Sequence, residues 1–282
     1  MAAAAVQTSI NFLTNDPSLY KTEKPYQIKY NAAPDIPVSN LRFEKQSSLT
    51  ISSIRGREAD FSFEKNGFTV LNLNGTVPPY EDFDRPEGVR SYILAATTAL
   101  KALLGAQKVQ AFQYVIRKRD KDYPNMKDKT VEISQPTSIA HIDTTKEEAA
   151  TTFQRVNGET SNGLSDPHYQ VVNLWKPLRG PLYDWPLALC DASTINPSTD
   201  LEPCDQVFAK SASENVQVRY REQQRWYYLE GQRADEVLVF RQSDSREESK
   251  CGVPHSSFPN PLAKEGELPR ESIEVRTLVS YS

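Results

Sequence analysis

Residues 138–145 read SIAHIDTT, and this stretch places His141 and Asp143 two positions apart at the end of a predicted strand. In a strand, residues i and i+2 point to the same side, so an imidazole and a carboxylate at this spacing converge without any special backbone. The pair alone is a weak signal, because buried polar side chains often pair for purely structural reasons. It predicts a metal site only when a third ligand is found.

The third ligand is expected to be His255, in the segment CGVPHSSF (251–258) that follows an apolar strand. The chain has only three histidines, and the remaining one, His168, stands in a loop-like context where we expect no ligation. Two histidines and one carboxylate on one face form a facial triad, which leaves coordination positions open and suits Fe(II). We therefore predict that His141, Asp143 and His255 bind the metal and carry the catalysis.

An arginine shortly after the distal histidine predicts an anion anchor. Arg270 is followed by Ser272, which shares its side of the last predicted strand and adds a hydroxyl donor. A guanidinium offers planar, permanently charged donors for the far carboxylate of a cosubstrate such as 2-oxoglutarate. Arg276 lies on the same face and competes for this role, and either arginine could instead pair with Glu274. We favour Arg270 because only Arg270 has the serine two residues later.

The order His-x-Asp, distal His, Arg-x-Ser resembles the Fe(II)/2-oxoglutarate-dependent dioxygenase superfamily. More specifically, residues 50–282 resemble a fungal family of hydroxylases and desaturases of secondary-metabolite pathways, which includes gibberellin desaturases and cephalosporin methoxylase-related proteins. The stretches that carry this resemblance are IRG (54–56), NGF (66–68), AHID (140–143), WKPL (175–178), PLALCD (186–191), WYY (226–228) and RESIEVR (270–276). The resemblance implies Fe(II), 2-oxoglutarate and O2 as cofactors, and the oxidation of a small molecule.

The local patterns predict a mainly β protein with few helices. A helix is expected to begin near Asp84 as its cap and to end at Gly105, and a second to begin after Thr145 and to end by Gly158. Asn-Gly at 66–67 predicts a tight hairpin between the stretches 61–63 and 68–71. Strands are expected at 109–118, 169–176, 186–190, 216–229, 235–242 and 272–280. Together with the resemblance, this predicts a double-stranded β-helix (jelly roll, cupin-like) core with flanking N-terminal helices.

The expected organisation is a single large domain preceded by an arm. Residues 1–47 show little periodicity and carry four prolines, so we expect an irregular N-terminal arm. Residues 48–282 are expected to form one oxygenase domain, with a helical and hairpin part over 48–108 and the jelly-roll core over 109–282.

Composition narrows the class of partner. The formal charge is −4, with 33 Lys and Arg against 37 Asp and Glu, so we expect no nucleic-acid partner. The sequence has no run of about 18 apolar residues, which a membrane-spanning helix would need, and no signal peptide is recognisable. Three widely spaced cysteines fit a reduced, cytoplasmic protein better than a disulfide scaffold. A small-molecule partner is expected, and a homodimer stays open.

The substrate contacts are expected to include Lys176, Trp175 and Tyr114. Lys176, and whichever of Arg270 and Arg276 does not bind 2-oxoglutarate, are expected to meet a carboxylate of a small, carboxylated or polyfunctional metabolite such as an amino acid or natural-product intermediate. The competing interpretation is that Trp175 packs in the barrel beside a lysine whose stem lies along it. Hydroxylation, desaturation and oxidative ring closure are all open. Three other functions stay open: a zinc hydrolase, an iron oxidase that does not use 2-oxoglutarate, and a non-catalytic β-barrel that binds a small molecule.

Overall fold

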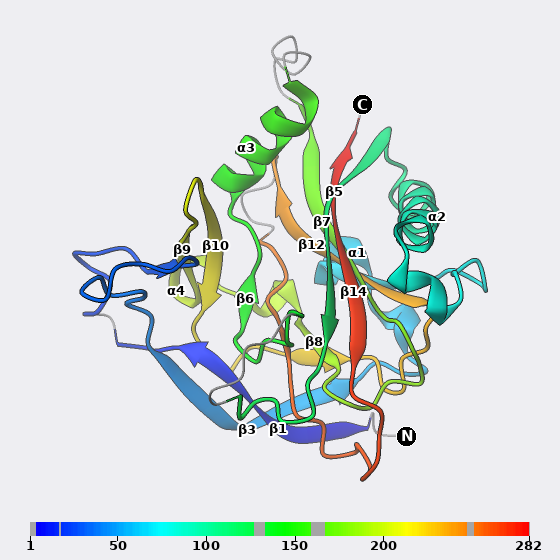
Figure 1. Cartoon of the computed structure of the whole chain (residues 1–282), viewed down its shortest axis with the longest axis horizontal. Helices are drawn as coiled ribbons and strands as arrows, with labels where there is room; N and C mark the ends of the chain where they lie inside the picture. Colours follow the sequence, from blue (N-terminus) through cyan, green and yellow to red (C-terminus); the bar gives the residue numbers. More distant parts are fainter. Residues whose placement is uncertain (1–3, 17, 127–132, 159–166, 247–250, 282) are drawn as a thin grey trace.

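Two facing β-sheets form the protein (Figure 1), and the computed structural model describes residues 4–16, 18–126, 133–158, 167–246 and 251–281. The five-stranded sheet has the order β4-β12-β7-β14-β5, with strands β4 (Phe68–Asn72), β5 (Lys108–Lys118), β7 (Tyr169–Pro177), β12 (Glu236–Asp244) and β14 (Glu271–Ser280). The nine-stranded sheet has the order β1-β3-β11-β8-β13-β6-β10-β9-β2, with strands β1 (Ala5–Leu13), β2 (Tyr26–Ile28), β3 (Phe43–Ser53), β6 (His141–Ile142), β8 (Leu187–Cys190), β9 (Leu201–Val207), β10 (Ala212–Val218), β11 (Trp226–Tyr228) and β13 (His255–Ser257).

The inner faces of the two sheets pack on each other. Trp175 and Phe240 of the five-stranded sheet share a buried cluster with Leu187 and Leu189 of the nine-stranded sheet. Strand pairing is antiparallel except between β11 and β3 and between β2 and β9. The predicted jelly roll is confirmed.

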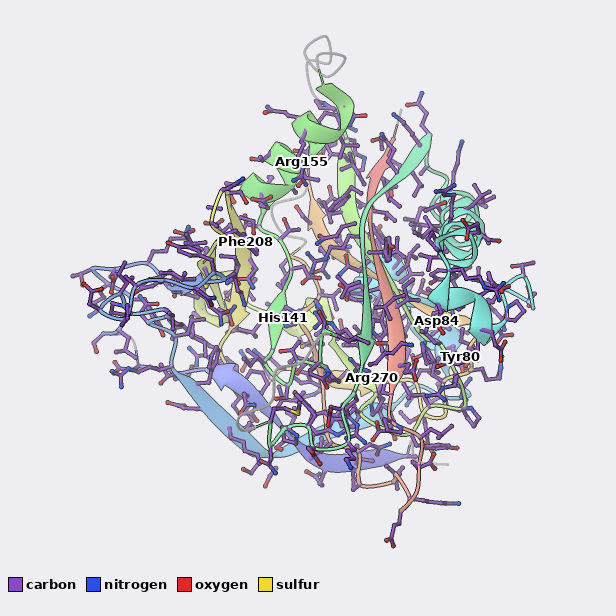
Figure 2. The ribbon with its side chains drawn as sticks, in the orientation of Figure 1. Tyr80, Asp84, His141, Arg155, Phe208 and Arg270 are labelled. Carbon is purple, nitrogen blue, oxygen red and sulfur yellow. The ribbon has the colours of Figure 1, made fainter. Side chains whose placement is uncertain are left out.

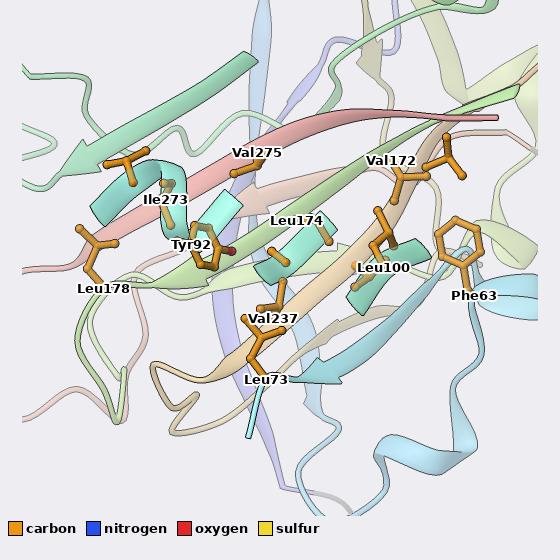
Figure 3. Packing of buried hydrophobic residues seen from close by; sticks show 14 of the residues in the cluster. Phe63, Leu73, Tyr92, Leu100, Val172, Leu174, Leu178, Val237, Ile273 and Val275 are labelled. Carbon is orange, nitrogen blue, oxygen red and sulfur yellow. The ribbon is translucent and has the colours of Figure 1, made fainter. Parts of the chain in front are cut away.

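The helices lie at the rims and on the outer face of this core. They are α1 (Phe63–Asn66), α2 (Pro86–Leu104), α3 (Lys146–Asn157) and α4 (Pro197–Asp200), with 3-10 turns η1 (Glu58–Asp60), η2 (Tyr80–Asp84) and η4 (Ala192–Thr194). Helix α2 covers the outer face of the five-stranded sheet, where Tyr92 and Leu100 pack against Leu174 and Val275 (Figure 3). Helix α3 stands beside β10, at the end of the molecule where the β9–β10 hairpin projects (Figure 1).

Both predicted helices are present, but only α3 begins at the predicted N-cap residue. Helix α3 is confirmed: the Thr145 side chain accepts from the backbone N–H of Glu148, and Gly158 follows its last turn. Helix α2 ends at Gly105 in the left-handed conformation, as predicted, but its N-cap residue is Arg85, which makes no capping hydrogen bond. Asp84 closes η2 instead, because the proline-rich approach to the helix already turns there.

The N-terminal segment is not irregular over the described residues. Strand β1 pairs with β3 along its length, and its side chains alternate between exposed and buried. Strand β2 adds to the far edge of the same sheet beside β9. Three of the four prolines, Pro25, Pro34 and Pro37, lie in the connections rather than in β1, and Pro17 lies outside the described residues. The partner strand of β1 begins only at Phe43, so a local sequence pattern could not reveal the pairing.

Two further strand predictions are corrected. Helix α1 (Phe63–Asn66) stands where one arm of a hairpin was predicted, and Gly67, at φ 80°, is its C-cap. The positive φ angle of Gly67 was predicted correctly, but it ends a helix instead of forming a hairpin turn. Ser62 begins this helix by accepting a hydrogen bond from the backbone N–H of Lys65. The predicted strand 216–229 is two strands, β10 and β11, separated by a turn. Among the described residues, no helix is both long and apolar enough to cross a membrane.

Candidate functional site

The three predicted metal ligands converge between the two sheets. His141 of β6 and His255 of β13 are directly opposite each other across an antiparallel pair, so both rings leave the same face of the nine-stranded sheet. Asp143 follows β6. Its carboxylate lies 3.5 Å from Nε2 of His141 and 3.6 Å from Nε2 of His255. One ligand atom from each residue fits within 4.8 Å of the other two, which is the spacing that a single metal ion requires.

Both imidazoles are held in the tautomer that a metal needs. Nδ1 of His141 lies 2.8 Å from the carbonyl oxygen of Ile139, and Nδ1 of His255 lies 3.2 Å from that of Val253. Each Nδ1 therefore carries the hydrogen, and each Nε2 keeps its lone pair toward Asp143. Burial, and then the neighbouring His141, lowers the pKa of His255 to about 3, so this ring stays neutral and able to ligate.

Asp143 is fixed by donors from the opposite sheet. Asn173 of β7 donates to Oδ2 and Arg276 of β14 donates to Oδ1, each at 2.6 Å. The backbone N–H of Asp143 donates to Gln242 of β12 at 2.7 Å. Burial alone raises the pKa of Asp143, but the charge of Arg276 and the contacts with the two histidines outweigh it and hold this pKa well below its usual range. The carboxylate is therefore ionised and ready for a cation.

One face of β14 carries a row of polar side chains toward this centre. Arg270 directly precedes β14, and Ser272, Glu274 and Arg276 follow at alternate positions within it, so the four side chains share the inner side of the strand. All but Arg276 are buried. Glu274 lies between the two arginines, and burial and the charge of Asp143 raise its pKa. The row links the metal ligands to the start of the strand.

The start of this row has two buried polar atoms without a partner. Arg270 is 2% exposed, and its Nε and the Oγ of Ser272 have no hydrogen-bond partner among the described residues. Nη1 of Arg270 donates to the carbonyl oxygen of Trp185 at 2.7 Å, and the guanidinium lies 5.4 Å from the ring centre of Trp175. Burial, and then Arg117, lowers the pKa of Arg270 to about 9. A desolvated cation beside an orphaned hydroxyl is a site that a carboxylate would satisfy.

Trp175 faces the inner side, but Lys176 and Tyr114 do not. Lys176 is fully buried on the outer face of β7, where its ammonium group lies 4.7 Å from the ring centre of Phe83. Tyr114 is paired with Val275 on that same outer face and is 49% exposed. The two predicted substrate contacts are therefore corrected: side chains alternate along a strand, so a lysine next to an inward-facing tryptophan must point outward.

Two residues that orient Asp143 were missed. Asn173 and Gln242 are polar positions inside strands that are buried along their whole length. A polar residue in such a strand is itself a signal, because burying it is costly unless it has a partner. That signal could have identified both residues, though not the partner that they bind.

A cavity of about 250 Å³ opens beside the metal-binding group. Asp143 and Arg276 lie at one end of it, and its walls come from α3, β5 and the β9–β10 hairpin. In Figure 2, His141 lies between Arg155 and Phe208 on the side of this cavity and Arg270 on the side of β14. The arrangement places a group that could hold a metal ion at the wall of an open cavity, and the buried Arg270 lies at the other end of the polar row.

Known proteins are similar to this chain in sequence and in fold. A family described as an oxidoreductase/YMDC permease-like domain matches residues 10–280. The Fe(II)/2-oxoglutarate-dependent dioxygenase nvfI of Aspergillus novofumigatus is 32% identical over 234 residues, which is 80% of each chain. The hydroxylase/desaturase poxK of Penicillium oxalicum is 30% identical over 276 residues, 86% of this chain and 82% of the relative.

A solved structure agrees with the sequence relatives. The structure of the iron and alpha-ketoglutarate-dependent endoperoxidase NvfI superposes with a TM-score of 0.86 at 25% identity and covers 100% of both chains. The expected family, its cofactors Fe(II), 2-oxoglutarate and O2, and the enzyme class are confirmed. This chain belongs to the family of fungal Fe(II)/2-oxoglutarate-dependent dioxygenases.

Proposed function

We propose that His141, Asp143 and His255 hold the Fe(II) of this dioxygenase, and that Arg270 and Ser272 bind the far carboxylate of 2-oxoglutarate. The observation that carries the proposal is the pair of buried atoms, Arg270 Nε and Ser272 Oγ, that have no hydrogen-bond partner among the described residues. They lie at the start of the strand that also carries Arg276, the partner of Asp143. A buried guanidinium whose Nε has no hydrogen-bond partner is costly even with Asp184 and Glu274 nearby, so the site suits an anion that arrives with the ligand.

The residues around the triad keep it in a geometry that can bind the metal. The carbonyl groups of Ile139 and Val253 hold the two rings, and Asn173 and Arg276 prevent the Asp143 carboxylate from rotating. Such supporting contacts commonly determine metal affinity as much as the ligands themselves do. Three ligands from one face leave the opposite side free for 2-oxoglutarate and O2.

The substrate is proposed to be a small molecule of a fungal secondary-metabolite pathway. Support comes from relatives that are named a hydroxylase/desaturase, an endoperoxidase and an aspirochlorine biosynthesis protein. When bound, Fe(II) with 2-oxoglutarate and O2 supplies an oxidant strong enough for an unactivated C–H bond, and 2-oxoglutarate is converted to succinate and CO2. The protein's own part is to hold one carbon of the substrate close to the metal and to keep competing groups away. Hydroxylation, desaturation and ring closure all follow from such positioning.

The assignment of the metal ligands is tested by binding under anaerobic conditions. Fe(II) and 2-oxoglutarate should give a visible charge-transfer absorption with the wild-type protein and with His168→Ala, because His168 pairs with Asp244 and stacks on Tyr281 instead of joining the triad. His141→Ala should bind little iron and give no such absorption while keeping its circular dichroism spectrum. Wild-type iron content in His141→Ala would show that the ligand assignment is wrong.

A further inference from the structure

The cavity beside Asp143 has one wall that is a single face of helix α3. Glu148, Thr152 and Arg155 line it, at positions i, i+4 and i+7 of the helix. The remaining walls come from Phe112 and Gln113 of β5, Val171 of β7, and Phe208 with residues 211–213 of the β9–β10 hairpin. We refer to this space as the α3 cavity. Its volume suits a compact organic molecule that partly protrudes through the opening.

Two cationic groups line the α3 cavity, and only Arg155 has no bonded partner among the described residues. Arg276 donates to Asp143 and lies near Glu274, so its charge is already balanced. Arg155 makes no hydrogen bond or salt bridge with any residue that the structure describes. A cation in the last turn of a helix also complements the helix dipole, but that effect does not require the side chain to line a cavity. Burial raises the pKa of Glu148 and the charge of Arg155 acts against this, so Glu148 lies within electrostatic range while the hydrogen-bond donors of Arg155 stay available to a ligand.

The apolar part of the cavity has an aromatic side chain at its rim. Phe208 begins the turn of the β9–β10 hairpin, where its N–H donates to the carbonyl oxygen of Ser211, and it is 43% exposed. It belongs to none of the buried clusters of the described core, whereas Phe112 and Val171 extend the cavity toward one of them. An exposed aromatic ring beside a cation gives one surface for an apolar body and one for a charged group. Figure 2 shows Arg155 and Phe208 on the same side of His141.

We propose that the α3 cavity binds the substrate that the enzyme oxidises, and that this substrate is a monocarboxylic acid. Its carboxylate pairs with Arg155, and its apolar body packs on Phe208 and Phe112. The inference rests on the proposed function, because it takes the Asp143 end of the cavity as the reacting end. Arg155 follows Glu148 by two helical turns, so the carboxylate is held roughly 10 Å farther along the cavity than the part of the substrate near the metal. Arg155 takes the role that the sequence had assigned to Lys176.

The charges in the cavity favour one carboxylate over a phosphate. A single arginine without a partner among the described residues balances one negative charge and can bind a carboxylate through two parallel hydrogen bonds. A phosphate would bring a second charge that Arg155 cannot balance. A neutral substrate would leave Arg155 without the strongest contact that it can make.

The test compares acids with their methyl esters. Aryl-alkyl and terpenoid carboxylic acids, beginning with 6-phenylhexanoic acid and methyl 6-phenylhexanoate, are titrated calorimetrically into the anaerobic protein loaded with Fe(II) and 2-oxoglutarate. We expect the wild type to bind acids at least tenfold more tightly than esters, which corresponds to a difference in binding free energy of about 1.4 kcal/mol. Arg155→Gln should remove this preference, and Arg155→Lys should keep part of it. Phe208→Ala should weaken acid and ester equally. Arg90→Gln, on the exposed side of α2, serves as the matched control.

The outcomes separate this inference from the proposed function. If wild-type protein gives no charge-transfer absorption with Fe(II) and 2-oxoglutarate, the proposed function fails. If the absorption forms and no acid in the set binds more tightly than its ester, the inference alone is wrong. The inference is equally wrong if Arg155→Gln keeps the preference for acids. Equal loss of preference in Arg90→Gln would overturn it too, since the effect would then come from net charge rather than from the cavity.

Discussion

Arg276 donates from Nη2 to Oδ1 of Asp143 at 2.6 Å, and this contact joins the last strand of the five-stranded sheet to the metal-binding edge of the other sheet. The pairing keeps the pKa of Asp143 depressed in the folded protein despite burial. A depressed carboxylate pKa contributes stability that is present above the unfolded value, about 3.9, and is lost as the pH falls through the folded value. The wild-type site should therefore retain iron at mildly acidic pH.

Arg276→Gln is expected to raise the lowest pH at which the site still retains iron. Without the guanidinium, burial dominates and the folded pKa of Asp143 rises, so protons compete with iron at a higher pH. The measurement is bound iron against pH for the wild type, Arg276→Gln and Arg276→Lys, of which the lysine variant should behave more like the wild type. Superimposable iron-retention curves for wild type and Arg276→Gln would rule out this role.

Arg270→Ala should raise the concentration of 2-oxoglutarate needed for half-maximal turnover while leaving the iron content unchanged. Removing one partner of a buried, charge-assisted pair costs about 2–5 kcal/mol. Ser272→Ala should have a smaller effect of about 1 kcal/mol, since it removes one neutral donor. If Arg276→Ala shows the large change in 2-oxoglutarate requirement and Arg270→Ala does not, the anchor is Arg276.

Lys176→Met is expected to stabilise the protein at and below neutral pH. Burial lowers the pKa of Lys176 to about 7, so between about pH 7 and 10.4 the unfolded chain binds a proton that the folded chain does not. The stability of the wild type should therefore rise with pH across this window, and below it the full penalty of a buried charge, about 3–5 kcal/mol, applies. Contacts with the rings of Phe83 and Tyr92 offset about 1–2 kcal/mol of this.

Urea unfolding at pH 6 and pH 9 measures the effect. The methionine variant should be more stable than the wild type at pH 6, and the gap should narrow at pH 9. A gap that does not depend on pH would mean that packing of the methionine, rather than the lysine charge, accounts for it.

Gly67→Ala should destabilise the protein and weaken iron binding. At φ 80°, a Cβ on Gly67 would lie 2.6 Å from Cγ2 of Val253, whose carbonyl oxygen orients His255. The strained backbone and the overlap together are expected to cost about 2–4 kcal/mol. Gly105→Ala is the matched control, because its φ is also positive but a Cβ there meets open space. Unfolding and iron content are measured for both, and equal losses would exclude the steric explanation.

Local patterns in the sequence were sufficient where a single segment determines its own structure. Thr145 before an acidic first turn predicted helix α3, and Gly105 predicted the end of α2, because caps depend only on neighbouring residues. The His-x-Asp pair and the distal histidine predicted the group that the structure brings together. The two histidines could be predicted to converge because His141 and His255 are paired directly opposite each other on β6 and β13.

Facing direction could not be predicted for the central strands. Strand β7 is buried along its whole length on both faces, so its hydrophobicity has no alternation that would indicate which of Trp175 and Lys176 points inward. Strand β5 is only partly buried, but Tyr114, Val115 and Ile116 are consecutive, so its sequence shows no clear alternation at Tyr114 either. Only the register with β14 decides these positions, and register between segments that lie far apart in the chain is not a local property.

Strand β14 lies between β7 and β5 in the finished sheet, yet it is the last described strand of the chain to be synthesised. At about 5–20 residues per second, a ribosome adds residues 256–280 over roughly 1–5 s after His255. During that interval the nascent chain already contains all three proposed iron ligands but lacks the arginine that steadies Asp143. Free Fe(II) that binds early would meet Asp143 without its Arg276 contact and without the proposed anchor at Arg270, so the site is complete only after β14 has inserted into its sheet.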